Sequence, residues 1–448
     1  MTSPLSLFKN ILGVKDAVIT KIDGGDDTSD CHVYLRPRLH TLGKCPTCGK
    51  KCSGYDDGSG SGESTWCALD LSGKKVFLHC PTQRVECPEH GVQAASVPWA
   101  FPRSRFTKNF EFVAAWLARD LSKSRVAEFL RIDWDTVGRC MSRVRQVLEL
   151  DLSNCLNGLV NIGVDETSYR KGHSYITTVV NHDTQEIVWI AEGFGQAVFS
   201  QFFEKLTKEQ RQSIKTVTGD GARWIDFVIQ KYIPHAIRCT DLFHVVSWTT
   251  DVVDEERRTA SREAKKDLQK ATTLAKEETA SEEVRSVAKA NAAQKSRISN
   301  AIKYSKGTLA KRHNEHTEND TIRLLMIKEH SQSLFDAFIM KEQLRLVLKY
   351  PAEKIQSGIN AWLSLYLSSE HPPFKELAEK IQRHATHIVN AVQTGLSNAR
   401  VEAFNNKIKL IIRKAYGFRN LNNLFDMIYL VCSKRSIPLP GRGSGAIA

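Results

Sequence analysis

Two short cysteine motifs limit how the first hundred residues can fold. Cys45-Pro-Thr-Cys48-Gly and Cys87-Pro-Glu-His90-Gly each place two soft metal ligands on one tight turn. Two such turns can complete a tetrahedral zinc site, and zinc would stabilise a small domain that has little core of its own. The sequence therefore predicts a zinc site whose ligands are Cys45, Cys48, Cys87 and His90.

The stretch between the two motifs has the layout of a zinc ribbon. It contains a polar loop at residues 56–64, which we expect to be flexible, and a strand-like segment at Lys75–His79. We expect residues 1–100 to form this zinc-ribbon domain. Four further cysteines are either substitute ligands or small buried apolar residues: Cys31, Cys52, Cys67 and Cys80.

Length and charge indicate the kind of partner. A chain of 448 residues is long enough for two to four domains, and its net charge of +13 favours a polyanion, nucleic acid rather than membrane. We find no signal peptide and no apolar run of membrane-spanning length, so we expect a cytoplasmic protein. Eleven cysteines in a cytoplasmic chain favour metal binding and buried thiols over disulfides.

Residues 101–152 have the pattern of a helix-turn-helix DNA-binding domain. Phe110–Leu121, Ser122–Phe129 and Trp134–Leu148 have helical apolar spacing, and a tight turn at residues 131–133 separates the last two. Arg139 and Arg143 on the last helix are candidates for DNA contacts. The alternative is a generic three-helix bundle with a solvated basic face.

From Gly158 the pattern changes to strands. Three successive strands are predicted at Leu159–Val164, Ser174–Val180 and Glu186–Ala191, and they should form an antiparallel meander. Helices and strands then alternate, with helices at 197–206 and 222–232 and strands at 214–218 and 235–240. This order is that of a ribonuclease-H-like fold, which we expect to begin at residues 153–248.

Two aspartates follow strands of this predicted sheet. Asp165 should end the first strand and Asp220 the fourth, and in this fold the two strands are neighbours. Three carboxylates at one sheet edge can hold two divalent ions that act on a phosphodiester, and magnesium prefers such oxygen ligands. Glu402 is the best candidate for the third acid. Glu166 should point to the opposite face, and the alternative for each aspartate is a turn or helix-capping role.

A helix is predicted at Leu396–Gly417, where polar side chains form a stripe beside an apolar one. The apolar stripe is Val401, Phe404, Ile408, Ile411 and Ala415. The polar stripe is Glu402, Asn406, Lys409 and Arg413. We expect Lys409 and Arg413 to contact DNA phosphates near the acid. The alternative is an ordinary amphipathic helix with a solvated charged face.

The remaining chain is helical in pattern, and we expect an all-α insertion at residues 249–394. Asp254–Ser305 is predicted to form one or two long exposed helices. We expect their charged side chains to form a solvated face; a surface for DNA contact or dimerisation is the less favoured alternative. Thr321–Tyr350 should form a packed helical core, followed by helices at Ile359–Leu367 and Phe374–Val392. Residues 395–435, with helices ending near residue 434, should complete the catalytic core, and residues 436–448 should be disordered.

Taken together, these motifs resemble the ISL-three family of insertion-sequence transposases over nearly the whole chain. The carrying segments are CPTCG and CPEHG, GVDETSYRKGHSY (163–175), GDGARW (219–224), DLFHVV (241–246) and SNARVEAFNNKIKLIIRKAYGFRN (397–420). The resemblance implies a zinc ribbon, a helix-turn-helix and a DDE domain with Asp165, Asp220 and Glu402 as catalytic acids. It also implies a supporting D-x-x-H element at Asp241 and His244.

The chain departs from the family pattern at two places. Ala399 and Ala403 stand where the family more often has glycine, which predicts a more regular helix. His90 is a variant zinc ligand. These changes leave catalysis expected but admit a degenerate copy of the element's enzyme.

The resemblance implies a DNA transposase that binds terminal inverted repeats, cuts DNA with two Mg²⁺ or Mn²⁺ ions and joins the freed 3′ ends to target DNA. Pairing two ends would require a homodimer or larger oligomer on double-stranded DNA, and the protein would be associated with the bacterial nucleoid when bound. Two other functions stay open. One is a non-catalytic DNA-binding protein, either a repressor or a decayed copy, and the other is a structure-specific nuclease of the same fold.

Overall fold

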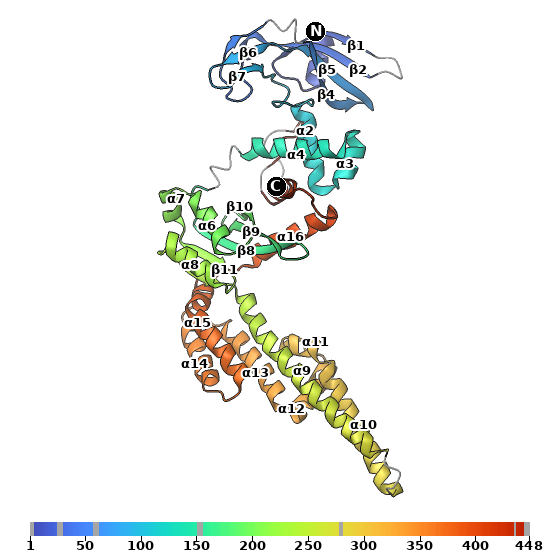
Figure 1. The fold of residues 1–448 in the computed structure, drawn as a ribbon, viewed down its shortest axis with the longest axis vertical. Helices are drawn as coiled ribbons and strands as arrows, with labels where there is room; N and C mark the ends of the chain where they lie inside the picture. The colour runs from blue at the N-terminus through green and yellow to red at the C-terminus, as the bar shows by residue number, and fades with distance from the viewer. Residues whose placement is uncertain are drawn as a thin grey trace. The chain divides into compact units, whose positions relative to one another are not determined.

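The computed structural model describes residues 4–24, 30–56, 62–149, 156–276, 281–433 and 436–442 (Figure 1). The chain forms two compact units: unit 1 comprises Met1–Asn157 and Asn406–Ala448, and unit 2 comprises Gly158–Asn405. The range 395–435, expected to complete the catalytic core, therefore contributes to both units. Three expectations lie wholly or partly outside the described residues: the polar loop expected at 56–64, the helix end expected near residue 434 and the disordered tail expected at 436–448.

Unit 1 begins with α1 (Pro4–Ile11) and two small sheets. The first sheet has the order β1-β2-β5-β4, in which β2 and β5 run parallel and the other pairs antiparallel. Alternate residues of β5 are buried, as a half-buried strand requires, and they pack with Trp66 and Trp99, whose rings meet edge to face. Its strands are β1 (Ala17–Asp23), β2 (Cys31–Pro37), β4 (Glu63–Leu71) and β5 (Lys74–Pro81).

The second sheet of unit 1 carries the cysteine motifs. Its order is β3-β6-β7, and both pairs are antiparallel. The strands are β3 (Ser53–Gly54), β6 (Arg84–Cys87) and β7 (Gly91–Ala94). The motif Cys87–His90 is thus the turn between β6 and β7, which explains why its two ligands face the same side.

Three helices follow, as predicted for residues 101–152. They are α2 (Lys108–Asp120), α3 (Lys123–Leu130) and α4 (Trp134–Glu149). The hydroxyl of Thr107 caps α2 and that of Ser122 caps α3. Arg131 ends α3 in the left-handed conformation (φ 54°), and this sharp stop allows α4 to turn away after a short connection.

The last helix of the chain, α17 (Leu421–Cys432), packs against α2 and α4 of the same unit. Asp426 of α17 is buried and forms an ion pair with Arg145 of α4. Burial raises the pKa of the Asp426 carboxyl, and Arg145 acts against this effect. The helix-turn-helix region is therefore a four-helix assembly that the C-terminal helix completes.

Unit 2 contains a five-stranded sheet of order β10-β9-β8-β11-β12. The pairs β8–β9 and β9–β10 are antiparallel, whereas β8–β11 and β11–β12 are parallel. The strands are β8 (Asn161–Arg170), β9 (Ser174–Asn181), β10 (Glu186–Glu192), β11 (Thr216–Gly219) and β12 (Ile237–Thr240). The connecting helices are α6 (Gln196–Glu204), α7 (Lys208–Ser213) and α8 (Arg223–Tyr232).

The first strand of this sheet is longer than expected. Its apolar run ends at Val164, but pairing with β9 continues as far as Arg170. Asp165 therefore lies within β8, and the expectation that it ends the strand was wrong. It does lie beyond the segment that pairs with β11, because that ladder stops at Gly163.

The segment from β12 to residue 394 is helical. The long helix α9 packs along α10 and α13, and α15 packs against β12. The helices are α9 (Leu242–Leu274), α10 (Glu282–Lys303), α11 (Lys306–Ala310), α12 (Glu318–His330), α13 (Gln332–Val347), α14 (Ile355–Leu367) and α15 (Pro372–Thr394). The expected segment Thr321–Tyr350 is two helices, because Ser331 leaves the helical conformation between them.

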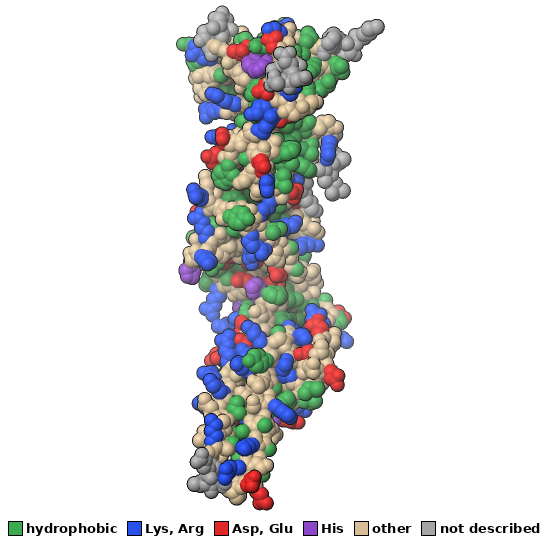
Figure 2. All heavy atoms as spheres, turned by 90° about the vertical axis from the view of Figure 1, so that its right-hand side faces the viewer, with side chains coloured by type: hydrophobic (Ala, Val, Ile, Leu, Met, Phe, Trp, Pro, Cys, Tyr) green, Lys and Arg blue, Asp and Glu red, His purple; other side chains and the backbone are tan. Residues whose placement is uncertain are grey.

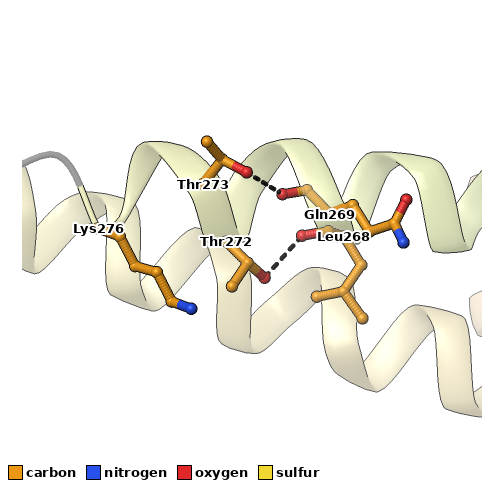
Figure 3. A pocket seen from close by; sticks show the side chains of 5 residues that line it. All are labelled: Leu268, Gln269, Thr272, Thr273 and Lys276. Carbon is orange, nitrogen blue, oxygen red and sulfur yellow. Dashed lines mark hydrogen bonds between the residues drawn. The ribbon is translucent and has the colours of Figure 1, made fainter.

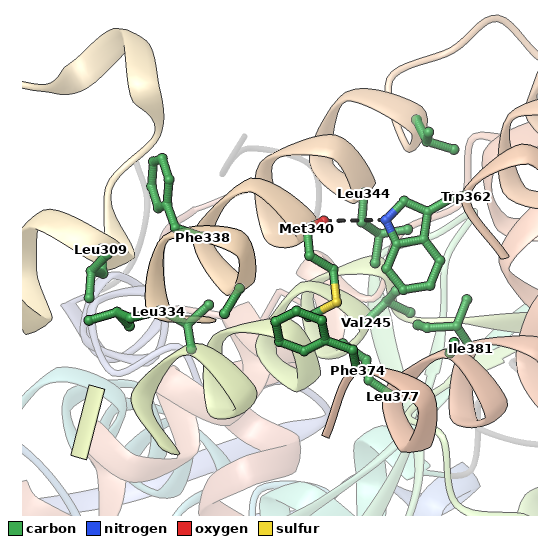
Figure 4. Close-up of a cluster of buried hydrophobic side chains, with 14 of the residues drawn as sticks. Val245, Leu309, Leu334, Phe338, Met340, Leu344, Trp362, Phe374, Leu377 and Ile381 are labelled. Carbon is green, nitrogen blue, oxygen red and sulfur yellow. Dashed lines mark hydrogen bonds between the residues drawn. The ribbon is translucent and has the colours of Figure 1, made fainter. Parts of the chain in front are cut away.

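An apolar core holds these helices together (Figure 4). Trp362 of α14 lies in this core, and its indole N–H donates to the Met340 carbonyl at 3.3 Å, so the ring's polar atom is satisfied. Figure 4 shows side chains from α9, α13, α14 and α15 meeting around Met340. This packing fixes the position of the first turns of α9, which follow β12 directly.

Helix α16 (Ala399–Lys414) has the two stripes that its sequence predicts. Its apolar stripe is buried at Val401, Phe404, Ile408 and Ile411. Glu402, Lys409 and Arg413 are exposed. Ala399 and Ala403 lie on the exposed side, so the two alanines are accommodated in a regular helix.

We expect Asp426→Ala to destabilise unit 1 by about 3 kcal/mol, because it removes one partner of the buried ion pair that joins α17 to α4. Urea unfolding measures the loss, and hydrogen–deuterium exchange should be faster in α2 and α4. Asn422→Ala, which changes an exposed residue of the same helix, is the control. A loss below about 1 kcal/mol, the usual range for an exposed pair, would contradict this assignment.

Candidate functional site

Asp165 and Asp220 lie at equivalent positions on two adjacent parallel strands, just beyond the last pair of the β8–β11 ladder. Asp165 lies two residues beyond Gly163, and Asp220 lies two residues beyond Thr218, the partner of Gly163 in the β8–β11 ladder. Asp220 follows β11 directly, and its Oδ1 accepts a hydrogen bond from the Ala222 amide (2.9 Å) before α8. The register of one strand pair therefore places both aspartates at the same edge of the sheet.

Another acidic residue, Asp241, follows the next strand along the sheet. Asp241 comes directly after β12, its amide donates to the Gly219 carbonyl (2.8 Å), and its carboxylate caps α9 through the Phe243 amide (3.2 Å). The Nε2 of His244 lies 3.8 Å from Asp241 Oδ2. The predicted D-x-x-H element is thus the first turn of α9, beside the edge that carries Asp220.

Glu402 lies on α16, and its charge contributes to the raised pKa of Asp241. It lies in the first turn of that helix and is exposed, and its amide donates to the Asn398 carbonyl (3.0 Å). One turn further on, the side-chain amide of Asn405 donates to Asp165 Oδ2 at 2.7 Å. This hydrogen bond joins α16 to β8 next to the first acid.

The charges of these groups influence one another. The pKa of Asp165 is raised to about 6, mainly by burial and to a smaller extent by the charges of Asp220 and Asp241, while the hydrogen bond from the Glu166 amide and the charge of His244 act in the opposite direction. Burial also raises the pKa of Asp241, with contributions from Glu402 and Asp220. A divalent cation would relieve this repulsion, and carboxylate oxygens are the ligands that Mg²⁺ prefers.

The three predicted acids are less tightly grouped than the ligands of a single ion. Among the described residues, they are not a set whose ligand atoms all lie within 4.8 Å of one another. Two ions about 3.5–4 Å apart would spread their ligands more widely than one ion does. The three side chains are all carboxylates, so their chemistry fits hard cations such as Mg²⁺ or Mn²⁺. Glu166 accepts from the Gly195 amide (3.0 Å) instead of joining the group.

A buried polar network fixes the beginning of α16. Thr218 Oγ1 donates to Asn398 Oδ1 (2.8 Å), so the contact between His182 Nε2 and Thr218 (2.7 Å) requires His182 to donate from Nε2. Arg400 donates to the His182 carbonyl. A side chain at Gly163 would lie 2.6 Å from Val401, so the close approach of α16 to β8 requires glycine there.

The sequence predicted the acids but neither Asn405 nor this network. Asn398 and Asn405 both lie in the segment 397–420 that carries the family resemblance. Only their burial, at 1% and 6% exposure, sets them apart from surface asparagines.

The predicted DNA-contact residues of the helix-turn-helix differ in their surroundings. Arg139 is exposed and donates to Thr136 Oγ1 (2.7 Å) on its own helix. Arg143 Nε donates to Glu111 Oε2 (2.7 Å), and the Glu111 side chain is completely buried. Arg143 therefore neutralises an internal carboxylate, and its guanidinium is not the free cation that the sequence led us to expect.

The four predicted zinc ligands lie close together in the structure. Cys45, Cys48, Cys87 and His90 form a group whose ligand atoms all lie within 4.8 Å of one another. The Cys48 and Cys87 sulfurs are 3.8 Å apart, as two sulfurs bound tetrahedrally at about 2.3 Å from zinc would be. The hydrogen bond from His90 lowers the pKa of Cys87 to about 6, which favours the thiolate that zinc binds.

An open pocket on α9 is not a second candidate site (Figure 3). Its lining comes from α9 and the turn that follows: Leu268, Gln269, Thr272, Thr273 and Lys276. Both threonine hydroxyls donate to carbonyls of the same helix, at 2.7 and 3.0 Å. Few polar groups remain to bind a ligand.

Basic side chains are widely distributed on the surface. On the face shown in Figure 2, Lys and Arg side chains lie over many elements and alternate with acidic ones. The net charge of +13 is therefore not gathered in one patch on that face.

None of the described helices combines the length and apolar character that crossing a membrane needs.

Models of three known domain families match this chain. A family model described as transposase, the DDE domain of ISL3 transposases, matches residues 162–428. The helix-turn-helix domain of transposase family ISL3 matches residues 95–145, and the zinc finger of transposases IS204/IS1001/IS1096/IS1165 matches residues 41–90. The fold and these motifs define an insertion-sequence transposase.

Curated relatives cover almost the whole chain. The transposase for insertion sequence element IS1557 of Mycobacterium tuberculosis is 36% identical over 441 residues, which is 97% of each chain. The transposase for IS1001 of Bordetella parapertussis is 25% identical over 88% of this chain and 89% of its own. The chain belongs to the ISL3 family of transposases, as the sequence motifs predicted.

We expect Cys87→Ser to remove zinc from unit 1, because three ligands cannot complete a structural site. Metal analysis should find about one zinc per parent chain and a small fraction of that in the variant, with loss of ordered structure around β6 and β7. Cys31→Ser, outside the ligand group, should keep its zinc. Equal zinc in both variants would rule out this ligand set.

We expect His182 to make unit 2 less stable in acid. Burial lowers its pKa to about 4, so below pH ~6.5 the unfolded chain takes up a proton that the folded chain does not. Stability should fall between pH ~6.5 and ~4, by about 2 kcal/mol at pH 5. Urea unfolding of the parent and of His182→Gln at pH 7 and 5 measures this; equal losses in both proteins would refute it.

Proposed function

We propose that this protein is an active DDE transposase that binds the terminal inverted repeats of an insertion sequence and catalyses DNA cleavage and strand transfer. The observation that carries the proposal is the convergence of β8, β11 and α16. Two aspartates leave one edge of adjacent strands, and the Asn405–Asp165 hydrogen bond attaches the helix that bears Glu402. The catalytic acids are Asp165, Asp220 and Glu402.

The strand order supports a ribonuclease-H-like core. Three antiparallel strands followed by two parallel ones, with helices between, is the arrangement of that fold. We propose this core for residues 153–248 and 395–435, with residues 249–394 as an all-α insertion. Residues 1–100 would be the zinc ribbon, and residues 101–152 the helix-turn-helix, which α17 completes.

The three acids would hold two Mg²⁺ or Mn²⁺ ions, which supply activation of the attacking oxygen and stabilisation of the leaving oxygen. In cleavage, water attacks the phosphorus and the bond to the element's 3′ oxygen breaks, giving a 3′-hydroxyl. In transfer, that hydroxyl attacks target DNA and displaces another 3′ oxygen. Asp241 holds His244 beside the acids as a supporting group, and no side chain forms a covalent bond to DNA.

DNA contacts would come from exposed cations. We assign Arg139 to the terminal repeats, and Lys409 and Arg413 to phosphates along α16. Arg143 supports the domain through Glu111. Pairing two ends would require a homodimer or larger oligomer, which the native mass of a paired-end complex tests. The protein would act in the cytoplasm, on the nucleoid.

A non-catalytic DNA-binding protein and a structure-specific nuclease are the alternatives. A decayed copy would have lost part of the acid site, but all three acids are present and α16 is regular in spite of its two alanines. A nuclease that cuts junctions would not need modules that bind element ends, whereas this chain has both a zinc finger and a helix-turn-helix.

We expect Asp165→Asn, Asp220→Asn and Glu402→Gln each to weaken Mn²⁺ binding at least about tenfold and to abolish cleavage, because each removes a charged ligand. Calorimetry of the zinc-loaded protein with a DNA duplex present gives the affinity. The control is Glu166→Gln, which removes a different carboxylate of β8; this variant should bind Mn²⁺ as the parent does. Unchanged binding in the three acid variants would refute the catalytic assignment.

A further inference from the structure

The side chain of Asn405 fixes the orientation of the first acid. Its Nδ2 donates to Asp165 Oδ2 at 2.7 Å, and the Glu166 amide donates to Asp165 Oδ1 at 2.8 Å. Each carboxylate oxygen therefore has one donor, one from its own strand and one from α16. With both oxygens held, the plane of the carboxylate is set, and lone pairs remain for a cation.

The other half of the same amide has no partner within the described chain. Asn405 is 6% exposed, and its Oδ1 is buried without a hydrogen bond. Rotating the amide by 180° would not help, because it would turn a carbonyl oxygen towards the carboxylate. An unpaired buried acceptor costs about 1–3 kcal/mol. Leucine has a similar shape and no such cost, but it cannot donate a hydrogen bond to Asp165, so this hydrogen bond is what asparagine supplies at the position.

The anchoring of α16 does not depend on Asn405 alone. The start of the helix is held by the bond from Thr218 to Asn398 and by Arg400 on the His182 carbonyl. Val401 and Phe404 of the same helix are buried. The helix can therefore stay in place when Asn405 is changed, which makes its effect on Asp165 separable from helix docking.

We infer that Asn405 is a positioning residue that presents Asp165 to the catalytic cation and couples that orientation to the docking of α16. This inference rests on the proposed function. Because Glu402 lies one turn earlier on the same helix, the helix that brings the third acid also aligns the first. Residues that orient a ligand in this way typically contribute 10–100-fold to metal affinity.

The test is Mn²⁺ affinity, measured from the free Mn²⁺ signal in electron paramagnetic resonance on the zinc-loaded full chain with a DNA duplex present. Asn405→Leu and Asn405→Ala should each weaken binding about tenfold. Asn405→Leu should unfold at no lower temperature than Asn405→Ala, because it fills the space without a polar atom. Asn406→Ala, on the exposed side of the same turn, should bind as the parent does. Asp165→Asn gives the affinity that remains when the first acid itself is removed, and the DNA duplex without protein gives the Mn²⁺ held by DNA alone.

The outcomes separate the two claims. If Asn405→Leu and Asn405→Ala bind Mn²⁺ like the parent while Asp165→Asn does not, Asn405 is structural and the inference fails, but the proposed function stands. If the parent binds no more Mn²⁺ than Asp165→Asn, both fail. If Asn405→Leu does not fold, Asn405→Ala decides, since a smaller side chain cannot clash.

Discussion

The parallel pairing of β8 with β11 is the constraint on which the candidate active site depends. It aligns Gly163 with Thr218, so that the chain delivers an aspartate two residues later on each strand. Gly163 also leaves the space in which Val401 approaches the sheet, and Thr218 supplies the hydroxyl that holds Asn398. Gly163 and Thr218 thus fix where Asp165 and Asp220 follow along their strands. The same two residues also fix where α16, which carries Glu402, packs against the sheet.

Helix α16 belongs to both units of the chain. Its residues as far as Asn405 are part of unit 2, where they contact β8, and those from Asn406 are part of unit 1. There the Lys414 ammonium donates to the Arg119 carbonyl (3.0 Å), at the end of α2. One continuous helix therefore takes part in the acid site at its beginning and in the helix-turn-helix assembly at its end. Each unit therefore depends on residues of this helix.

Structural features that depend on the spacing of a few neighbouring residues could be predicted from the sequence. Interactions between segments far apart in the sequence could not. The cysteine turns, the three helices after residue 107 and the stripes of α16 all follow from local spacing. The end of β8 was misplaced because an apolar run marks burial, whereas strand length here depends on pairing with β9. Arg143 looked like a surface cation because its partner, Glu111, is far away in the sequence. The role of α17 was missed for the same reason. Its apolar residues predict that the helix is buried, but they do not predict that it packs against α2 and α4.

The zinc ribbon and the acid site differ in how many segments must come together, and this bears on how such an enzyme could decay. Two turns supply all the zinc ligands, and the helices of the helix-turn-helix lie in the same unit as these turns. The acids come from three separate segments of unit 2, none of which contributes to the zinc site. If the three acids act as proposed, the loss of one would end catalysis without removing any element of unit 1. The proposed enzyme would then be one substitution away from a DNA-binding protein without catalytic activity.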